Sequence, residues 1–347
     1  MSNFFRGWNW EPPEDWPRIK TIDMHTAGEP LRVITDGLPE IPGNTILEKS
    51  SYFKNHYDHL RTGLMWEPRG HADMYGAIIT PPVTKDGDFG VFFIHNEGYS
   101  SMCGHAIIAL TTLMYETGRF QAEGKEPVLR IDAPPGRITA RAIIENQRIK
   151  RVYFENVPSF VLHNQKELEV PGIGKITIDI AYGGAFYTFT EADPLGLQLC
   201  SDNYNQLIDV GRRIKHAAIN QFDVNHPYSE DLSFLYGTIF TGSPEDPGNH
   251  SRNVCIFADG EVDRSPTGTG VSARAAIHHL KGDISIGESI TIESILGTCM
   301  DVKVKERVKF GPHEAVIPEV GGTAYITGQN EFFFDPSDPL NKGFIFR

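Results

Sequence analysis

Two stretches of this sequence carry the same motifs in the same order, and that order sets strong limits on the fold. In the first half, a strand-like segment enters a small-residue turn at Asp23–Gly28, and about 80 residues later a glycine turn opens a helix-like segment at Met102–Leu110. The second half repeats this order at Ile180–Ala185 and Pro266–Arg274. Repeated supersecondary units predict repeated structure, so we expect two similar halves.

The glycine turns align residue by residue. Matching Cys103 with Thr267 also matches Gly104 with Gly268. A third pair of glycine-containing segments follows roughly 30 residues later, each before a strand-like run, at Pro135–Ala140 and Leu296–Asp301. We therefore predict a pseudo-twofold molecule with a cleft between its halves.

Short apolar runs bounded by Gly, Pro, Asn and Asp dominate the chain, a pattern typical of strands. The runs are Leu31–Ile34, Tyr75–Thr80, Val91–His95, Ile138–Ile144, Arg151–Phe154, Ile176–Ile180, Ala185–Thr190, Leu235–Phe240, Val254–Ala258, Val302–Val308 and Ala324–Thr327. Helix-like segments are fewer: Glu48–Leu60, His105–Glu116, Cys200–Asn220 and Val271–Lys281. Because the helices do not alternate regularly with the strands, the pattern disfavours a doubly wound parallel sheet.

The length of 347 residues suits about two domains. We expect a first domain over 21–172, to which the segment 328–347 returns, and a second domain over 173–327. Residues 1–20, which contain Trp8, Trp10 and Trp16 among prolines and acids, are expected to be an extended lead-in that packs on the body.

Composition excludes several classes of function. The net charge of −13 repels phosphate backbones, so a general nucleic-acid role is disfavoured. No apolar run is long enough to span a membrane, and the first twenty residues lack the apolar core of a signal peptide. Four cysteines without CxxC spacing indicate neither a disulfide framework nor a zinc site. We expect a cytoplasmic protein.

The segment Asn96–His105 places a cysteine where a turn leads into a helix. At about Gly104 the helix begins, so the Cys103 thiol lies beside free backbone N–H groups at the positive end of the helix dipole. Such a position lowers a thiol pKa toward neutrality and provides a usable base or nucleophile. His105 adds a further donor or acid/base group. A buried structural cysteine is the alternative, and we favour it for the three other cysteines, Cys200, Cys255 and Cys299.

The matching segment Asp263–Gly270 exposes several backbone N–H groups and is suited to hold a carboxylate. Asp263 is suited to accept hydrogen bonds from a substrate ammonium. An ordinary capped helix start, with Ser265 or Thr267 as the cap, is the alternative. The glycines also mimic a dinucleotide-binding fingerprint, but no strand leads directly into them, so nicotinamide binding is disfavoured.

Two other polar segments are weaker candidates. Glu67–Asp73 is turn-like, and we favour a solvated loop over a cleft wall. His278 and His279 are adjacent on a helix-like segment and point to different faces, so a metal site there is improbable.

Three segments, at 23–30, 102–105 and 263–270, resemble the motifs of the proline racemase family. The resemblance extends from about residue 20 to the C-terminus. It implies the fold that this family shares with diaminopimelate epimerase: an α+β architecture of two pseudo-symmetric strand-rich domains, each with a helix whose N-terminus faces the cleft between them. It also suggests a homodimer.

The resemblance further implies an activity. In the family's racemases and hydroxyproline epimerases, each turn carries a cysteine, one on each face of the substrate's α-carbon. Here Cys103 stands at the first position and Thr267 at the second, as in the family's trans-3-hydroxy-L-proline dehydratases. The runs at 96–105 and 179–187 are similar to the animal members of that subgroup. This implies a hydro-lyase that forms 1-pyrroline-2-carboxylate without a cofactor or a metal.

The chemistry agrees with that subgroup. Racemisation needs a base on one face and an acid on the other, and both must exchange roles. A threonine hydroxyl does not ionise near neutral pH, so Thr267 is not a second base. Dehydration of the trans isomer needs one base only, because the α-hydrogen and the leaving hydroxyl share a face.

Carried over onto this sequence, the family motif makes Cys103 the acceptor of the α-proton, with Thr267 opposite. Substrate-binding residues are expected to be Gly104, His105, Asp263, Gly268 and Thr269. The backbone N–H groups would hold the carboxylate. Asp263 and His105 would bind the ring nitrogen. Whether the thiol or Thr267 assists the departing hydroxyl stays open. The alternatives are a proline racemase or hydroxyproline epimerase with one thiol, and a non-catalytic protein that binds imino acids.

Overall fold

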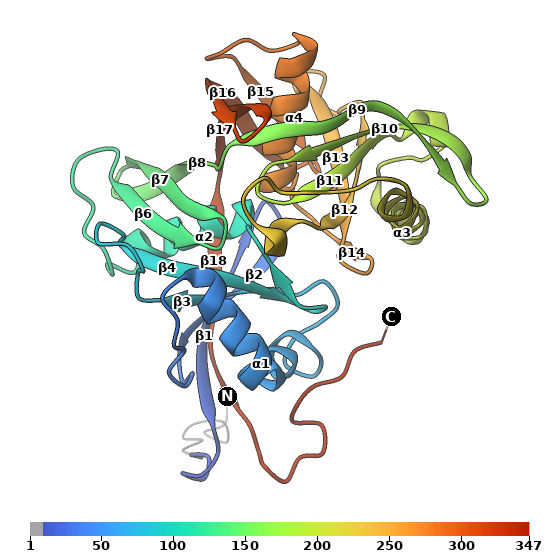
Figure 1. Cartoon of the computed structure of the whole chain (residues 1–347). Coiled ribbons are helices and arrows are strands. Elements are labelled where there is room, and N and C mark those ends of the chain that lie inside the picture. Colours follow the sequence, from blue (N-terminus) through green and yellow to red (C-terminus); the bar gives the residue numbers. More distant parts are fainter. Residues whose placement is uncertain (1–9, 347) are drawn as a thin grey trace, which may run out of the picture.

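The two halves of the chain fold into the same series of elements. The computed structural model describes residues 10–346, and within that range it has eighteen β-strands and four α-helices (Figure 1). The first half supplies β1 (Arg18–Thr26), β2 (Glu29–Asp36), α1 (Ile46–Met65), β3 (Tyr75–Thr80), β4 (Phe89–His95), β5 (Tyr99–Ser100), α2 (Gly104–Glu116), β6 (Val128–Ala133), β7 (Gly136–Glu145), β8 (Arg148–Glu155) and β9 (Ser159–Val170). The second half supplies β10 (Gly174–Tyr182), β11 (Phe186–Glu191), α3 (Tyr204–Gln221), β12 (Leu235–Gly242), β13 (Ser251–Phe257), β14 (Glu261–Val262), α4 (Gly268–Lys281), β15 (Ser289–Glu293), β16 (Cys299–Phe310), β17 (His313–Gly322) and β18 (Ala324–Phe333).

The strand pairing repeats as well. β2 pairs with β3 in parallel, as β11 does with β12, and α1 or α3 forms the crossover between the two strands. β4 pairs with β6 in parallel, as β13 does with β15, and α2 or α4 lies in that crossover. The other strand pairings in the described residues are antiparallel. The internal repeat and the strand-rich α+β fold predicted from the sequence are confirmed.

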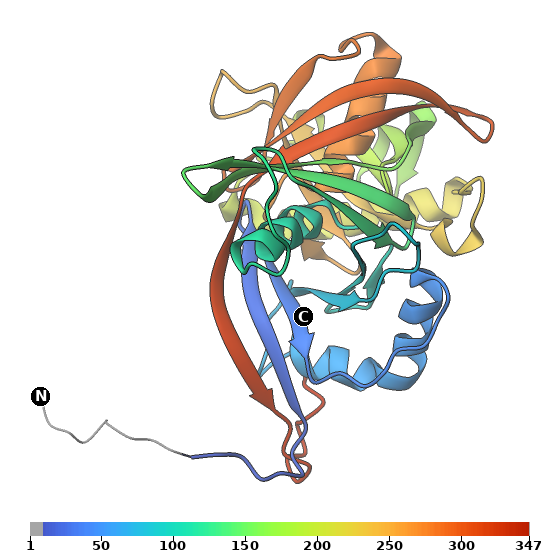
Figure 2. The same ribbon diagram turned by 90° about the vertical axis from the view of Figure 1, so that its left-hand side faces the viewer.

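The last strand of each half joins the sheet of the other half. β9 pairs with β10, and β18 pairs along its length with β1. In Figures 1 and 2, β18 descends from the upper part of the molecule beside β1. We call β1–β8 with α1, α2 and β18 the first lobe, and β9–β17 with α3 and α4 the second lobe.

The lobes are joined through a shared sheet. β8 pairs antiparallel with β17, so that Phe154 lies opposite Val320.

The domain boundary at residue 172 stays a prediction. Because β9 contributes to the sheet of the second lobe, we propose that the chain crosses between lobes near 156–158 and again near 323.

Two buried helices form the centre of the molecule. Every residue of α2 from Gly104 to Met114 is buried, as is every residue of α4 from Gly268 to Ile277. A helix that is apolar around most of its circumference packs inside a protein rather than on its surface. α4 ends at Gly282, which has a φ of 82° and closes the helix in the left-handed conformation. None of the helices in the described residues is long and apolar enough to cross a membrane.

Residues 10–17 lead into β1 without regular secondary structure. The Trp10 ring contacts Trp16 with a centroid distance of 6.0 Å and Phe333 of β18 with one of 5.8 Å. Trp8, which the sequence analysis groups with them, lies outside the described residues.

The segment Glu67–Asp73 is only partly the solvated loop that its sequence suggests. His71 is exposed, but Asp73 is buried. Its carboxylate forms an ion pair with Arg264 of the second lobe at 2.7 Å and accepts a hydrogen bond from the Tyr204 hydroxyl at 2.7 Å. The end of this segment therefore ties the two lobes together.

Candidate active site

A cavity between the N-termini of α2 and α4 brings the predicted site residues together. The cavity is small, with a volume of about 20 Å³. All seven residues predicted from the sequence line it: Cys103, Gly104, His105, Asp263, Thr267, Gly268 and Thr269. Six further residues complete the wall: Glu29, Tyr75, Met102, Tyr187, Tyr236 and Phe257.

The two helices meet at their first residues. A Cβ added to Gly104 would lie 2.6 Å from the Gly268 Cα, and the reverse holds for a Cβ on Gly268. Cys103 and Thr267 are the N-caps, and neither side chain makes a regular capping hydrogen bond. The first-turn N–H groups of both helices thus face one small cavity without a side-chain cap, an arrangement suited to a carboxylate.

Burial controls the ionisation of Cys103. Its thiol is 4% exposed, and its Sγ lies 3.2 Å from His105 Nδ1. Burial raises the pKa of Cys103 well above its usual value, and the charges of Asp263 and Glu29 raise it further. Hydrogen bonds from the Ala106 N–H and the Tyr75 hydroxyl oppose this rise. The thiol pKa near neutrality that we expect from the sequence is therefore wrong, because desolvation outweighs the helix terminus.

His105 is neutral in this environment. Burial lowers its pKa to about 3, and a hydrogen bond to the Pro30 carbonyl offsets only part of that effect. The edge of its ring packs against Tyr75 with a centroid distance of 4.9 Å. A neutral imidazole offers one donor and one acceptor, so His105 is suited to orient a ligand or the thiol.

Thr267 has a different backbone conformation from Cys103. Its φ of 70° is an outlier for a β-branched residue, whereas Cys103 is extended with a φ of −143°. The Thr267 hydroxyl makes no hydrogen bond of standard geometry within residues 10–346. It lies close enough to Asp263 and Cys255 to lower the pKa of both. Strain of this kind costs about 1–3 kcal/mol and is found most often at functional sites.

Two carboxyl groups share the wall beside Thr267. Glu29 is fully buried, and burial together with the charge of Asp263 raises its pKa well above the usual value. Burial also raises the pKa of Asp263. One oxygen of Glu29 accepts a hydrogen bond from the Arg264 backbone N–H at 2.7 Å, and the other makes none within the described residues. This acidic pair provides a site for a cationic group.

Sequence reasoning missed the wall residues that come from single strands. Tyr75 opens β3, Tyr187 lies on β11, and Tyr236 and Phe257 come from β12 and β13. Each reads in sequence as one more buried aromatic residue of a strand. Glu29 directly follows Gly28 in the motif at 23–30, and an acidic residue beside a small-residue turn is the signal that identifies it.

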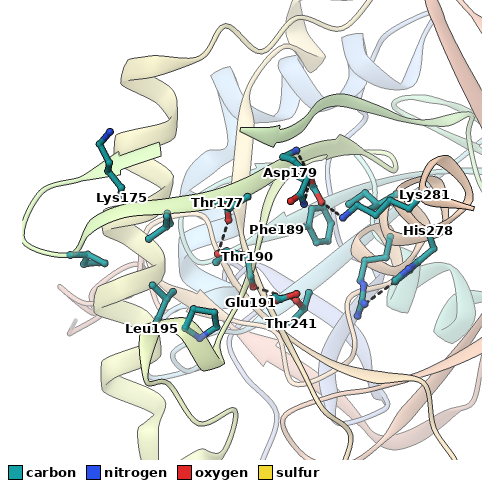
Figure 3. A pocket seen from close by; sticks show the side chains of 16 residues that line it. Lys175, Thr177, Asp179, Phe189, Thr190, Glu191, Leu195, Thr241, His278 and Lys281 are labelled. Carbon is teal, nitrogen blue, oxygen red and sulfur yellow. Dashed lines mark hydrogen bonds and ion pairs between the residues drawn. The ribbon is translucent and has the colours of Figure 1, made fainter. Parts of the chain in front are cut away.

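Larger cavities elsewhere contain none of the predicted residues. One of about 520 Å³ lies in the second lobe, where β10, β11 and α4 meet (Figure 3). Figure 3 shows Lys281 reaching Asp179 in this cavity, and the two form an ion pair at 2.8 Å. Another of about 1020 Å³ opens beside His95 and Tyr236. Within residues 10–346, no three His, Cys, Asp or Glu side chains gather closely enough to hold a metal ion.

Comparison with known proteins gives consistent matches over nearly the full chain. A curated relative from Colwellia psychrerythraea, named trans-3-hydroxy-L-proline dehydratase, is 52% identical and covers 97% of this chain and 96% of its own. A Homo sapiens protein of the same name is 44% identical, with 97% of each chain covered. A 3-hydroxyproline 2-epimerase from Burkholderia multivorans is 43% identical and covers 95% of this chain and 98% of its own.

Structure and family comparisons agree with these relatives. The crystal structure of a hydroxyproline epimerase from Agrobacterium vitis, solved with trans-4-hydroxy-L-proline bound, superposes with a TM-score of 0.90 at 28% identity and covers 95% of this chain and 96% of its own. The family model described as "Proline racemase" matches residues 21–345. The chain therefore belongs to the proline racemase family.

Proposed function

We propose that this protein is a trans-3-hydroxy-L-proline dehydratase, a hydro-lyase that works without a cofactor. The observation that carries the proposal is the asymmetry of the two helix caps: Cys103 and Thr267 line one cavity, and only Cys103 has an ionisable group. The names of the relatives from Colwellia psychrerythraea and Homo sapiens support the same reaction.

One base is sufficient for this reaction. In trans-3-hydroxy-L-proline the hydroxyl and the carboxylate lie on opposite ring faces, so the α-hydrogen and the hydroxyl share a face. The Cys103 thiolate takes the α-proton and becomes a thiol, the C3–O bond breaks, and the departing oxygen takes a proton from a donor in the site to leave as water. The resulting enamine tautomerises to 1-pyrroline-2-carboxylate.

The cavity wall supplies the binding groups. We place the substrate carboxylate against the first-turn N–H groups of α2 and α4, at Gly104, His105, Gly268 and Thr269. These donors would also stabilise the charge that develops on the carboxylate as the α-proton leaves. The ring nitrogen lies toward Asp263 and His105.

Substrate binding would also activate the base. The carboxyl groups of Asp263 and Glu29 raise the pKa of Cys103. A secondary ammonium beside Asp263 adds a positive charge near the thiol and neutralises part of that negative field. The pKa of Cys103 would therefore fall when the substrate binds, and the thiolate would form in the complex.

Two other functions compete with this one. Racemisation or epimerisation has the support of the relative from Burkholderia multivorans, but it needs a second acid where Thr267 stands. A protein that only binds imino acids would have no use for a buried thiol beside a histidine. We also retain the homodimer and the cytoplasmic location as proposals, which light scattering and cell fractionation would test.

The test is a product assay on the purified protein. Incubation with trans-3-hydroxy-L-proline should give a cyclic imine that reacts with o-aminobenzaldehyde, while chiral chromatography of L-proline should show no racemisation. Cys103→Ser should lower imine formation by about 10²–10⁴-fold, the usual contribution of a general base. It should still bind pyrrole-2-carboxylate. Cys200→Ser, which lies outside the cavity, is the matched control. Rapid epimerisation of proline with an inert 3-hydroxy substrate would refute the assignment.

A further inference from the structure

The hydroxyl of Tyr75 has no role in the steps above, although it lies beside the proposed base. Tyr75 begins β3, is 3% exposed and lines the same cavity as Cys103. The edge contact with His105, whose Nδ1 is 3.2 Å from the Cys103 Sγ, places Tyr75 on the Cys103 side of the cavity. Tyr75 therefore lies on the side of the cavity where the proposed reaction removes the α-proton.

The ring of Tyr75 is fixed from both lobes. It stacks on His95 with a centroid distance of 5.6 Å and an interplanar angle of 20°. The Nδ1 atom of His95 in turn lies 2.9 Å from a carboxylate oxygen of Glu261 of β14 in the second lobe, and both side chains are buried. A side chain held in this way loses little further freedom when it acts on a ligand, as preorganisation requires.

The Tyr75 hydroxyl is placed to donate its proton. It acts as a donor toward the Cys103 thiol and the Tyr236 hydroxyl, whereas the Ser100 hydroxyl lowers the pKa of Tyr75 and opposes the larger effect of burial. Burial raises the pKa of Tyr75 well above its usual value, so the phenol keeps its proton at neutral pH. A protonated phenol beside the thiol is a source of the proton that a departing hydroxide needs.

We propose that the Tyr75 hydroxyl protonates the 3-hydroxyl as the C3–O bond breaks, an inference that rests on the proposed dehydratase function. The α-hydrogen and the 3-hydroxyl share the ring face toward Cys103. A donor that adjoins the thiol on that face reaches the oxygen while the thiolate attends to the α-carbon.

The step balances without an outside proton. The thiolate of Cys103 first forms an S–H bond with the α-proton, and the electron pair of the C–H bond stays on the α-carbon and its carboxylate. That pair then becomes the new C2–C3 π bond as the C3–O bond breaks. The departing oxygen keeps the C–O electron pair and takes the Tyr75 proton to become water. The thiol then returns its proton to the tyrosinate, and thiolate and phenol are restored for the next cycle.

The other polar groups of the wall are less suitable. Thr267 caps the opposite helix, so its hydroxyl adjoins the other ring face. Glu29 interacts with Asp263 and Arg264, on the side that we assign to the ring nitrogen. Tyr236 also lies in the wall, but Cys103 acts on it through charge alone, whereas the Tyr75 hydroxyl hydrogen-bonds to the thiol.

The test compares two leaving groups in Tyr75→Phe. Fluoride is the conjugate base of a far stronger acid than water, so its departure needs little protonation. Tyr75→Phe should form imine from trans-3-hydroxy-L-proline about 10²–10⁴-fold more slowly. It should still release fluoride from trans-3-fluoro-L-proline at close to the wild-type rate, as measured with a fluoride electrode. Tyr325→Phe, on the exposed part of β18, is the matched control.

Each outcome decides between roles. If Tyr75→Phe loses the same factor in rate with both substrates, Tyr75 only supports Cys103. If it loses no rate with either substrate, the thiol protonates the oxygen itself. Either result refutes the proposal. If the wild type releases no fluoride, the isotope effect of 2-deuterated 3-hydroxy substrate decides. If the isotope effect falls toward one in Tyr75→Phe, C–O cleavage has become rate-limiting, which supports the proposal. An unchanged or larger isotope effect refutes the proposal. Binding of pyrrole-2-carboxylate checks the fold of the variant. A wild type that forms no imine would refute the proposed function instead.

Discussion

At the scale of single residues, the two helix caps differ in backbone as well as in side chain. Cys103 is extended and beside a neutral histidine, whereas Thr267 is held at a positive φ beside Asp263. A second cysteine at position 267 would therefore not simply restore a symmetric pair. The chemistry of each face depends on the surroundings of the cap residue.

The pKa shifts at Cys103 and His105 predict an unusual pH profile. Because burial raises the pKa of Cys103, the free enzyme holds little thiolate at neutral pH, and kcat/KM should rise steadily with pH from 6 to 8.5. His105, with a pKa of about 3, should add no inflection near 6.5. Stopped assays of imine formation across this range would measure the profile. A plateau from pH 7 down to 5 would contradict the raised thiol pKa.

Sequence reasoning identified the backbone and cap residues of the site but not their ionisation. The motifs around Gly104 and Gly268 depend on local turn geometry, which a sequence shows directly. The sign of the pKa shift at Cys103 depends on how much water the fold removes and on the nearby Glu29, which is 74 positions away in sequence. Such effects arise only when distant strands meet.

At the scale of elements, the site depends on the contact between two helix starts. α2 and α4 touch at Gly104 and Gly268, and Phe154 of β8 closes the space beside them. No side chain larger than hydrogen fits at either glycine without moving a backbone atom. This contact fixes how far apart the two sets of N–H groups stand.

Gly104→Ala should therefore destabilise the protein although alanine favours helices. The added Cβ would lie 2.6 Å from the Gly268 Cα and 3.0 Å from the Phe154 ring. Overpacking of this kind costs about 1–3 kcal/mol, against a gain of up to about 1 kcal/mol in helix propensity. The melting temperature (Tm) and kcat should both fall. Gly328→Ala, where the nearest atom is 4.0 Å away, is the control. If both variants keep the wild-type Tm and kcat, the close contact is not needed.

The elements themselves were predicted unevenly. All four helices were found, because each has a sustained apolar or capped pattern, although α3 begins at Tyr204 rather than at Cys200. The predicted boundary between the lead-in and the first domain, at residue 20, falls inside β1. Its Asp23 forms an ion pair with Arg32 of β2 at 2.9 Å, and this cross-strand contact accounts for a charge in a paired strand. A single strand gives no sign of its partner.

At the scale of the whole molecule, polar contacts hold the lobes together around the site. Asp73 of the first lobe binds Arg264 of the second, and Arg264 follows Asp263 directly in the chain. The backbone N–H of Arg264 also binds Glu29. The arrangement couples the position of the acidic pair to the packing of the two lobes.

Asp73→Asn should weaken this coupling. It removes the charge that pairs with Arg264, and a hydrogen bond to a charged group contributes about 1.5–3 kcal/mol. The free energy of unfolding in urea should fall by about that amount, and KM should rise because the Asp263 turn is held less firmly. Asp259→Asn removes an exposed ion pair with Arg212 and should change stability little. If the two variants have the same free energy of unfolding, the contact between the lobes does not contribute to stability.

The exchange of β9 and β18 between lobes suggests how such a site arose. Two copies of a half-length ancestor, each lending its final strand to the other, would have formed a symmetric pair with identical caps at its centre. In such a pair every substitution appears twice. In one polypeptide each cap can change alone, and the caps of this chain, Cys103 and Thr267, do differ.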